Sequence, residues 1–426
     1  MSAGDRVLVL APHPDDEVLG GGGLIQAATA LGLPVRVVFL TNGEANVWSF
    51  AVDQGALRLT PARARQLGMM RHAEALAADA TLGIPPDHLT FLGYPDHGTL
   101  AMWTSHWGLS QGFQSPWTRT TRVPYPNAYR SGAVYTGESV VADLTAILRD
   151  VRPTKVLVSH PADLHPDHLA LYLFTRVALW SLESELKPEL YPYLVHHPGW
   201  PRPARYEPAL GLAPPPALAT KIGWLQYPLP AAAESGKVAA LKKHRTQYAS
   251  DGIFLRQLVR TNELFGDFSS VPLPPGRTAI LVAPDDEKLP ADLPEELTSL
   301  ERGLFAALES IAIRRDGGDL AVTIAFSRPL QDETRVSLFV FGARPDRPFG
   351  AMPKLHVELG AHAEAAYDQA RRLSASSVTV RREANTASVR IPLGFLGDPD
   401  RLLVSGRSSV GRVPLAASPW RIVDLR

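Results

Sequence analysis

Ala11-Pro-His-Pro-Asp-Asp-Glu17 and Leu164-His-Pro-Asp-His168, the first and second H-P-D boxes, are the two stretches that decide the fold. Each follows a short apolar run, Arg6–Leu10 in the first case and Lys155–Val158 in the second, and each precedes an apolar stretch with helical spacing. Such continuously apolar runs are typical of buried parallel strands. We therefore expect each box at a turn from a strand to a helix, at the strand's carboxyl end, where open α/β sheets bind their ligands.

The imidazoles and carboxylates of the two boxes suit a metal site. Proline favours the first helical position, so the proline after each histidine places His13 and His165 just before a helix. His13 and Asp16 are then one turn apart and face the same way, and His165 and His168 repeat this spacing. Zn²⁺ binds imidazole nitrogen and carboxylate oxygen, and a catalytic site typically combines three protein ligands with water. One box alone could be only a helix cap, but two after apolar strands predict a shared metal site.

Length and composition narrow the class of protein. The 426 residues exceed what one core usually accommodates, so two domains are expected. The 43 basic and 43 acidic residues balance, which argues against a nucleic-acid partner and favours a small or neutral substrate. The absence of cysteine excludes disulfides, thiolate ligands and a cysteine nucleophile.

No apolar run reaches the length of a membrane span, so we expect no integral membrane segment. The chain leads directly into its first strand, which favours a cytoplasmic protein. An exported form with a trimmed leader stays open as an alternative. The oligomeric state is not predicted.

Apolar strands alternate with a helical segment through the first part of the chain, at Pro34–Thr41, Pro61–Leu82 and His88–Tyr94. This alternation predicts an α/β fold, with a Rossmann-like, mostly parallel sheet and helices on both faces. Gly20–Gly23 lacks the ending of a Walker A motif, so we interpret it as close packing of a helix backbone rather than as a phosphate loop.

Two features of this half have a functional and a structural interpretation. Residues 97–136 form a long connection rich in tryptophan and tyrosine, which is either an aromatic lid over the site or a loop packed onto the body. His196 and His197 are adjacent, and neighbours on a strand point to opposite faces, so we interpret them as structural.

The domains are expected at 1–268, a catalytic domain, and 294–426, a mainly-β, sandwich-like domain of unknown role. Residues 269–293 are predicted to form a linker, because Ser269–Gly276 is rich in proline. The second domain shows short strands separated by turn signals, and no group of catalytic residues stands out in it.

The first domain resembles the LmbE-like or PIG-L family of zinc-dependent de-N-acetylases, which includes N-acetylglucosaminyl-phosphatidylinositol deacetylase. The motifs that carry the resemblance are the first box, His160–His168, Phe91–Asp96, and a helix with Arg71 and Glu74. They cover roughly residues 1–268.

The resemblance implies roles for nine residues. The metal, Zn²⁺ or another divalent ion such as Fe²⁺, would be bound by His13, Asp16 and His168. Asp15 would be the general base. His165, oriented by Asp167, would be an electrophilic or general-acid histidine whose protonated form stabilises the oxyanion. The proton for the leaving amine would come from Asp15 or from His165. Substrate contacts would come from Arg71, Asp96 and Asp163, the last with a supporting role as its alternative.

These observations together predict a hydrolase that removes an N-acetyl group from an N-acetylglucosamine-like substrate with metal-activated water. One rival is a zinc amidohydrolase for another small N-acyl substrate. The other is a carbohydrate-binding protein with a vestigial site.

Overall fold

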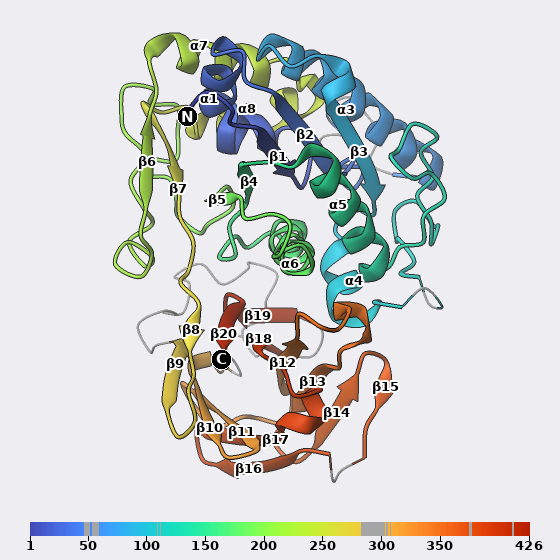
Figure 1. Ribbon diagram of the computed structural model, residues 1–426, viewed down its shortest axis with the longest axis vertical. Coiled ribbons are helices and arrows are strands. Elements are labelled where there is room, and N and C mark those ends of the chain that lie inside the picture. Colours follow the sequence, from blue (N-terminus) through green and yellow to red (C-terminus); the bar gives the residue numbers. More distant parts are fainter. Residues whose placement is uncertain are drawn as a thin grey trace. The chain divides into compact units, whose positions relative to one another are not determined.

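The computed structural model describes residues 1–46, 52, 59–108, 110, 112–282, 303, 306, 308–374, 377–410 and 413–426 (Figure 1). The chain divides into two compact units, Met1–Asp267 and Phe268–Arg426. Among the described residues, none of the helices combines the length and the apolar character needed to cross a membrane.

The first unit is built on a seven-stranded sheet of order β3-β2-β1-β4-β5-β7-β6. The first five strands in this order pair in parallel. At one edge, β7 pairs antiparallel with β5, and β6 pairs antiparallel with β7. The strands are β1 Val7–Ala11, β2 Val35–Thr41, β3 Leu89–Tyr94, β4 Lys155–Ser159, β5 Glu189–Tyr193, β6 Leu225–Pro228 and β7 Asn262–Phe265. The predicted α/β class with a mostly parallel sheet is confirmed.

Helices cover both faces of this sheet. Figure 1 shows α1, α3 and α7 together on one face and α4, α5 and α6 on the other. Their bounds are α1 Asp16–Ala30, α3 Pro61–Thr81, α4 Thr99–Ser105, α5 Gly137–Val151, α6 Pro166–Ser181, α7 Ala231–Leu241 and α8 Arg245–Gln257, with a short 3₁₀ turn at Pro86–His88.

The two box helices begin differently. In the second box, Pro166 is the first residue of α6 and His165 is its N-cap, as the proline rule predicts. In the first box, α1 begins at Asp16 with Asp15 as the N-cap, so Pro14 lies outside the helix. The expectation that His13 directly precedes the helix is therefore wrong by two residues.

The run Gly20–Gly23 lies within α1 and packs against neighbouring side chains. A Cβ atom on Gly20 would overlap the ring of Tyr193, and one on Gly21 would overlap Leu157. The interpretation of close backbone packing is confirmed, and this packing holds the start of α1 against the sheet.

The aromatic segment after β3 supports the packing alternative. Trp103 and Trp107 are buried, and their ring centroids lie 5.3 Å and 5.8 Å from that of Phe174 on α6. Tyr125 and Tyr135 are also buried. These rings attach the segment to the body of the unit rather than forming a lid.

The second unit contains two sheets, of order β16-β17-β11-β10-β9 and β15-β14-β13-β12-β18-β20-β8 with β19 beside β18. All pairs are antiparallel except β20 with β8. The strands are β8 Val271–Pro272, β9 Thr278–Val282, β10 Leu308–Asp316, β11 Asp319–Phe326, β12 Thr334–Ala343, β13 Lys354–Leu359, β14 Glu364–Asp368, β15 Arg371–Arg372, β16 Thr379–Glu383, β17 Thr386–Pro392, β18 Arg401–Val410, β19 Val413–Ala417 and β20 Arg421–Asp424.

Both sheets contribute apolar side chains to one core, for example Val322 of β11 and Val340 of β12. Strand β11 alternates buried and half-buried residues, as expected for a strand with one face on a core. Strands β8 and β9 fall in the segment expected to be a linker and belong to these sheets instead. The rest of that segment, 283–293, lies outside the described residues.

Candidate metal centre and pocket

The two boxes converge at the carboxyl ends of the adjacent strands β1 and β4. Asp16 Oδ2 lies 3.1 Å from His13 Nδ1 and 3.1 Å from His168 Nε2. All three side chains are buried. The predicted meeting of imidazoles and a carboxylate from distant turns is therefore present, with Asp16 between the two rings.

The chemistry of this cluster fits a divalent cation. Neither ring nitrogen of the buried His168 makes a hydrogen bond, although both lie within 3.2 Å of carboxylate oxygens. Burial opposes a charge on His168, but Asp16 and Asp163 raise its pKa to about 9. The carboxylates thus stabilise positive charge where both imidazoles meet Asp16, as a metal site requires.

His13, Asp16 and His168 are distributed over three overlapping groups of described residues that could hold an ion, and none of these groups contains all three. Ligand atoms lie within 4.8 Å of one another in three sets, which are His13 with His165 and His168, Asp16 with His168 and His196, and His13 with Asp96, His165 and Asp167. A buried His/Asp group that could bind a metal ion is therefore shown, while the identity of the metal is not.

Two more carboxylates lie behind the two imidazoles. His13 Nε2 is 3.2 Å from Asp167 Oδ2, and His168 Nδ1 is 3.2 Å from Asp163 Oδ2. Each ring therefore has one nitrogen toward Asp16 and the other toward a buried acid, the arrangement in which a carboxylate orients a metal-binding histidine.

The positions of these two acids differ from the family-based expectations. The carboxylate of Asp167 is 4.0 Å from His165 Nδ1 and makes its hydrogen bonds elsewhere, to His97 N at 2.7 Å and to Thr99 N at 3.1 Å. Only the backbone N–H of Asp167 reaches His165 Nδ1, at 3.3 Å. Asp163 is not among the described residues that line the pocket, and its carboxylate accepts from the backbone N–H groups of 195 and 196.

Asp15 occupies a strained turn beside the cluster. Its φ of 131° lies in the region that favours glycine, and its backbone N–H donates to the carboxylate of Glu17 at 2.9 Å. Its Oδ2 is 3.2 Å from Arg71 Nη2. Burial raises the pKa of Asp15 to about 7, although Arg71 acts in the opposite direction. A carboxyl group with this pKa can exchange a proton near neutrality.

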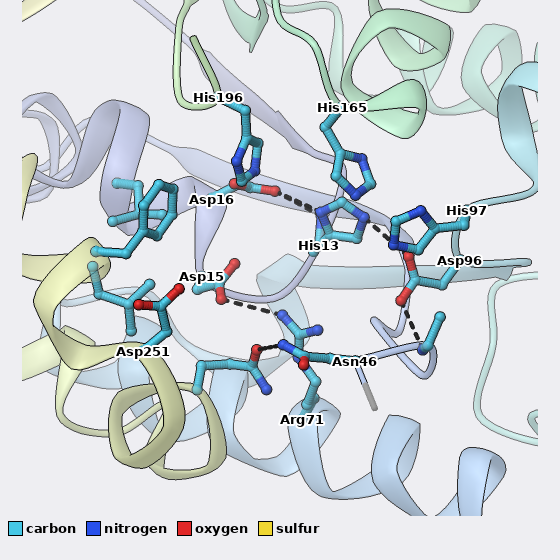
Figure 2. Close-up of a pocket in the computed structure, with 15 residues that line it drawn as sticks. His13, Asp15, Asp16, Asn46, Arg71, Asp96, His97, His165, His196 and Asp251 are labelled. Atoms are coloured by element: carbon cyan, nitrogen blue, oxygen red, sulfur yellow. Dashed lines mark hydrogen bonds and ion pairs between the residues drawn. The ribbon is translucent and has the colours of Figure 1, made fainter. Parts of the chain in front are cut away.

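A cavity of about 350 Å³ opens onto these groups (Figure 2). Arg71 and Asp96, the expected substrate contacts, both line it. Arg71 donates to Gly43 O at 2.9 Å and to Pro14 O at 2.8 Å, so its guanidinium fixes the turn of the first box. Asp96 accepts from Ala45 N at 2.8 Å, and its other oxygen is 3.3 Å from His13 Nε2.

His165 also lines the cavity, but the structure argues against the expected protonated form. Burial, together with the charges of His13 and His168, holds the pKa of His165 well below its usual range. A bound cation would act in the same direction. His165 is thus a neutral imidazole that can donate one N–H.

Sequence reasoning missed part of the cavity wall. His196 was interpreted as structural because neighbouring residues on a strand point to opposite faces, but β5 ends at Tyr193, before His196. The side chain of His196 lines the cavity next to Phe254. His97 also lines the cavity, and its position directly after Asp96 was the feature of the sequence that could have indicated this. The other unpredicted lining residues are Leu19, Ala45, Asn46, Gln247, Asp251, Phe254 and Leu255.

Comparison with known proteins finds a match to one family. Residues 8–179, which contain both boxes, match the family described as PIG-L, GlcNAc-PI de-N-acetylase. The matched region covers β1 to α6, the elements that carry all three proposed metal ligands.

Curated relatives of the chain are named 1D-myo-inositol 2-acetamido-2-deoxy-alpha-D-glucopyranoside deacetylase. The protein from Streptomyces avermitilis is 29% identical over 278 residues, which are 58% of this chain and 84% of that protein. The one from Actinosynnema mirum is 34% identical over 183 residues, 42% of this chain and 56% of that protein. The chain thus spans only about half the length of some of these relatives.

Solved structures similar to the chain include N,N'-diacetylchitobiose deacetylase from Pyrococcus horikoshii, at 21% identity and a TM-score of 0.37, with 61% of this chain and 82% of that one covered. Another is the teicoplanin deacetylase Orf2, at 16% identity and a TM-score of 0.37, with 57% and 84% covered.

Proposed function

We propose that this chain is a metal-dependent hydrolase that removes the N-acetyl group of an amino sugar. The observation that carries the proposal is the position of Asp16 between His13 and His168, with Asp15 opening into the same cavity. The PIG-L match and the names of the relatives support the N-acetylated sugar as the substrate class.

The residues present favour Zn²⁺ held by His13, Asp16 and His168, because two imidazoles and one carboxylate are ligands that zinc accepts in catalytic sites. When bound, such an ion polarises the amide carbonyl and brings the pKa of water to about 7. Asp163 and Asp167 would keep the two imidazoles in their orientation.

The residues of the chain would handle the protons. Asp15, with a pKa of about 7, would accept a proton from the attacking water and can return it to the leaving amine. The neutral His165 donates an N–H to the oxygen on which negative charge develops. Arg71 stabilises the charged form of Asp15 and fixes its turn.

We also propose a Rossmann-like arrangement for the first unit, supported by the order β3-β2-β1-β4-β5 of its parallel strands. The single core shared by both sheets supports a sandwich-like second unit.

The proposal is tested by incubating metal-loaded protein with a panel of N-acetylated amino sugars and other N-acyl amides, and measuring the amine released. We expect release from at least one amino sugar, and release slower by about 10²- to 10⁴-fold with Asp15→Asn. Release only from an amide that is not a sugar would contradict the substrate class. Sugar binding without any release would favour the binding-protein alternative.

A further inference from the structure

We infer that the α8 wall of the cavity binds a positively charged group of the substrate beside the amide. The preferred substrate is then an N-acetylated amino sugar joined to a sugar with a free amine. This inference rests on the proposed function and concerns the part of the substrate that does not react.

The α8 wall consists of Gln247, Asp251, Phe254 and Leu255, none of which belongs to either box. The helix is interrupted at Asp251, where φ is −142° and ψ is 38°. Asp251 is exposed, and among the described residues no arginine, lysine or histidine lies within 4.0 Å of its carboxylate. Figure 2 shows Asp251 beyond Asp15 as seen from His13, with Asp96 and His97 on the other side.

The other carboxylates of the cavity already have partners. Asp15 pairs with Arg71, Asp16 lies between two imidazoles, and Asp96 contacts His13 and a backbone N–H. Asp251 accepts a backbone hydrogen bond from Phe254 but, unlike the other three, has no basic side chain beside it among the described residues. Its charge is therefore the one that a cationic ligand can balance.

The cavity offers little to an anionic group. Arg71 is the one arginine or lysine among the described residues that line it, and its guanidinium is buried and occupied by Asp15 and two carbonyl oxygens. A phosphate or carboxylate held beside Asp251 would therefore meet a carboxylate, with no free arginine or lysine among the described lining residues to pair with it.

The surroundings of Asp251 suit a sugar that carries the charge. Asn46 Nδ2 donates to Gln247 Oε1 at 2.7 Å, which places two planar amides, groups that can bind hydroxyls, on this side of the cavity. Phe254 lies nearly parallel to His196, with an interplanar angle of 8°, and adds an apolar face. These neutral groups let one carboxylate set the charge preference.

The first test measures binding without turnover. Calorimetry on the metal-loaded full chain compares chitobiose, which carries amines, with cellobiose, which carries hydroxyls at the same positions. We expect chitobiose to bind about fivefold more tightly, the effect of about 1 kcal/mol for a partly exposed ion pair, and the preference to weaken with salt. Asp251→Asn should remove this preference, while Asp150→Asn, a matched change at an exposed acid on α5, should keep it. Equal preference in wild type and Asp251→Asn would overturn the inference.

The second test separates this inference from the proposed function. Values of kcat/KM are measured for mono-N-acetylchitobiose acetylated on the non-reducing ring, for N,N'-diacetylchitobiose and for N-acetylglucosamine 1-phosphate. We expect wild type to favour them in that order and Asp251→Lys to favour the phosphate. If wild type hydrolyses none of them, the proposed function fails, and the binding test alone decides the charge preference. An unchanged order in Asp251→Lys would contradict the inference.

Discussion

Replacement of Asp167 by asparagine tests whether a buried acid behind His13 sets the metal affinity. A full unit charge at the 3.2 Å between Asp167 Oδ2 and His13 Nε2 would be stabilised by about 5 kcal/mol at an effective dielectric constant of about 20. A metal-bound imidazole carries only part of that charge, and asparagine keeps one oxygen. We therefore expect a loss of about 10- to 100-fold in metal affinity, or about 1.4 to 2.7 kcal/mol.

The assay is competition for Zn²⁺ with a chromophoric chelator, with denaturation of the metal-free protein measured in parallel. Asp163→Asn is the matched variant, because Asp163 lies at the same 3.2 Å behind His168, and should give a loss of similar size. Asp79→Asn is the control, because Asp79 is buried but lies outside the cluster. Burial also raises the pKa of Asp79 well above its usual value, which favours a neutral carboxyl group there. Wild-type affinity in both folded cluster variants would refute this account of the two carboxylates.

Three further predictions concern the base, its pH dependence and the packing of α1. Asp15→Asn should keep its metal and lose about 10²- to 10⁴-fold in kcat, measured by amine release with metal analysis of the same sample; near-normal turnover would exclude Asp15 as the base. Because the carboxylate form of Asp15 accepts the proton, activity should fall as the pH drops through the pKa of Asp15, which is at or below about 7 with a cation bound. Arg71→Gln should move this acidic limb of the pH–activity profile to higher pH, because Arg71 lowers the pKa of Asp15. An acidic limb that stays in place would show that another group titrates. Gly20→Ala should lower the free energy of unfolding by about 1 to 3 kcal/mol in denaturant titrations, because a Cβ atom there overlaps the ring of Tyr193. Gly223→Ala is the control and should have little effect, because no atom lies within 4 Å of its added Cβ. Equal stability of the two variants would contradict the packing of α1.

The apolar runs and the two H-P-D boxes predicted the α/β fold of the first unit, because buried strands and the turns that follow them are encoded in short stretches of sequence. The position of α1 relative to Pro14 was not predictable in this way. Asp15 adopts a φ that residues other than glycine rarely take, and contacts with Glu17 and with Arg71, which is distant in the sequence, help to hold it there. The start of this helix therefore depends on tertiary contacts.

The metal ligands were predictable because two motifs carry them, but their supporting groups were not. Asp167 lies one residue from His168, yet its carboxylate reaches His13, which is 154 residues away in the chain. His196 and Asp251 enter the cavity from segments without a motif, so only the folded chain brings them to the site. The aromatic segment had two interpretations in the sequence, and burial of Trp103 decides between them.

The most direct test of the metal site is zinc stoichiometry combined with X-ray absorption on the wild-type chain and on His13→Ala and His168→Ala. We predict one ion per chain, coordinated by two imidazoles and one carboxylate, and loss of tight binding in each variant. A wild-type chain that binds no ion, or binds one without these imidazoles, would contradict the convergence of the two boxes on a shared metal.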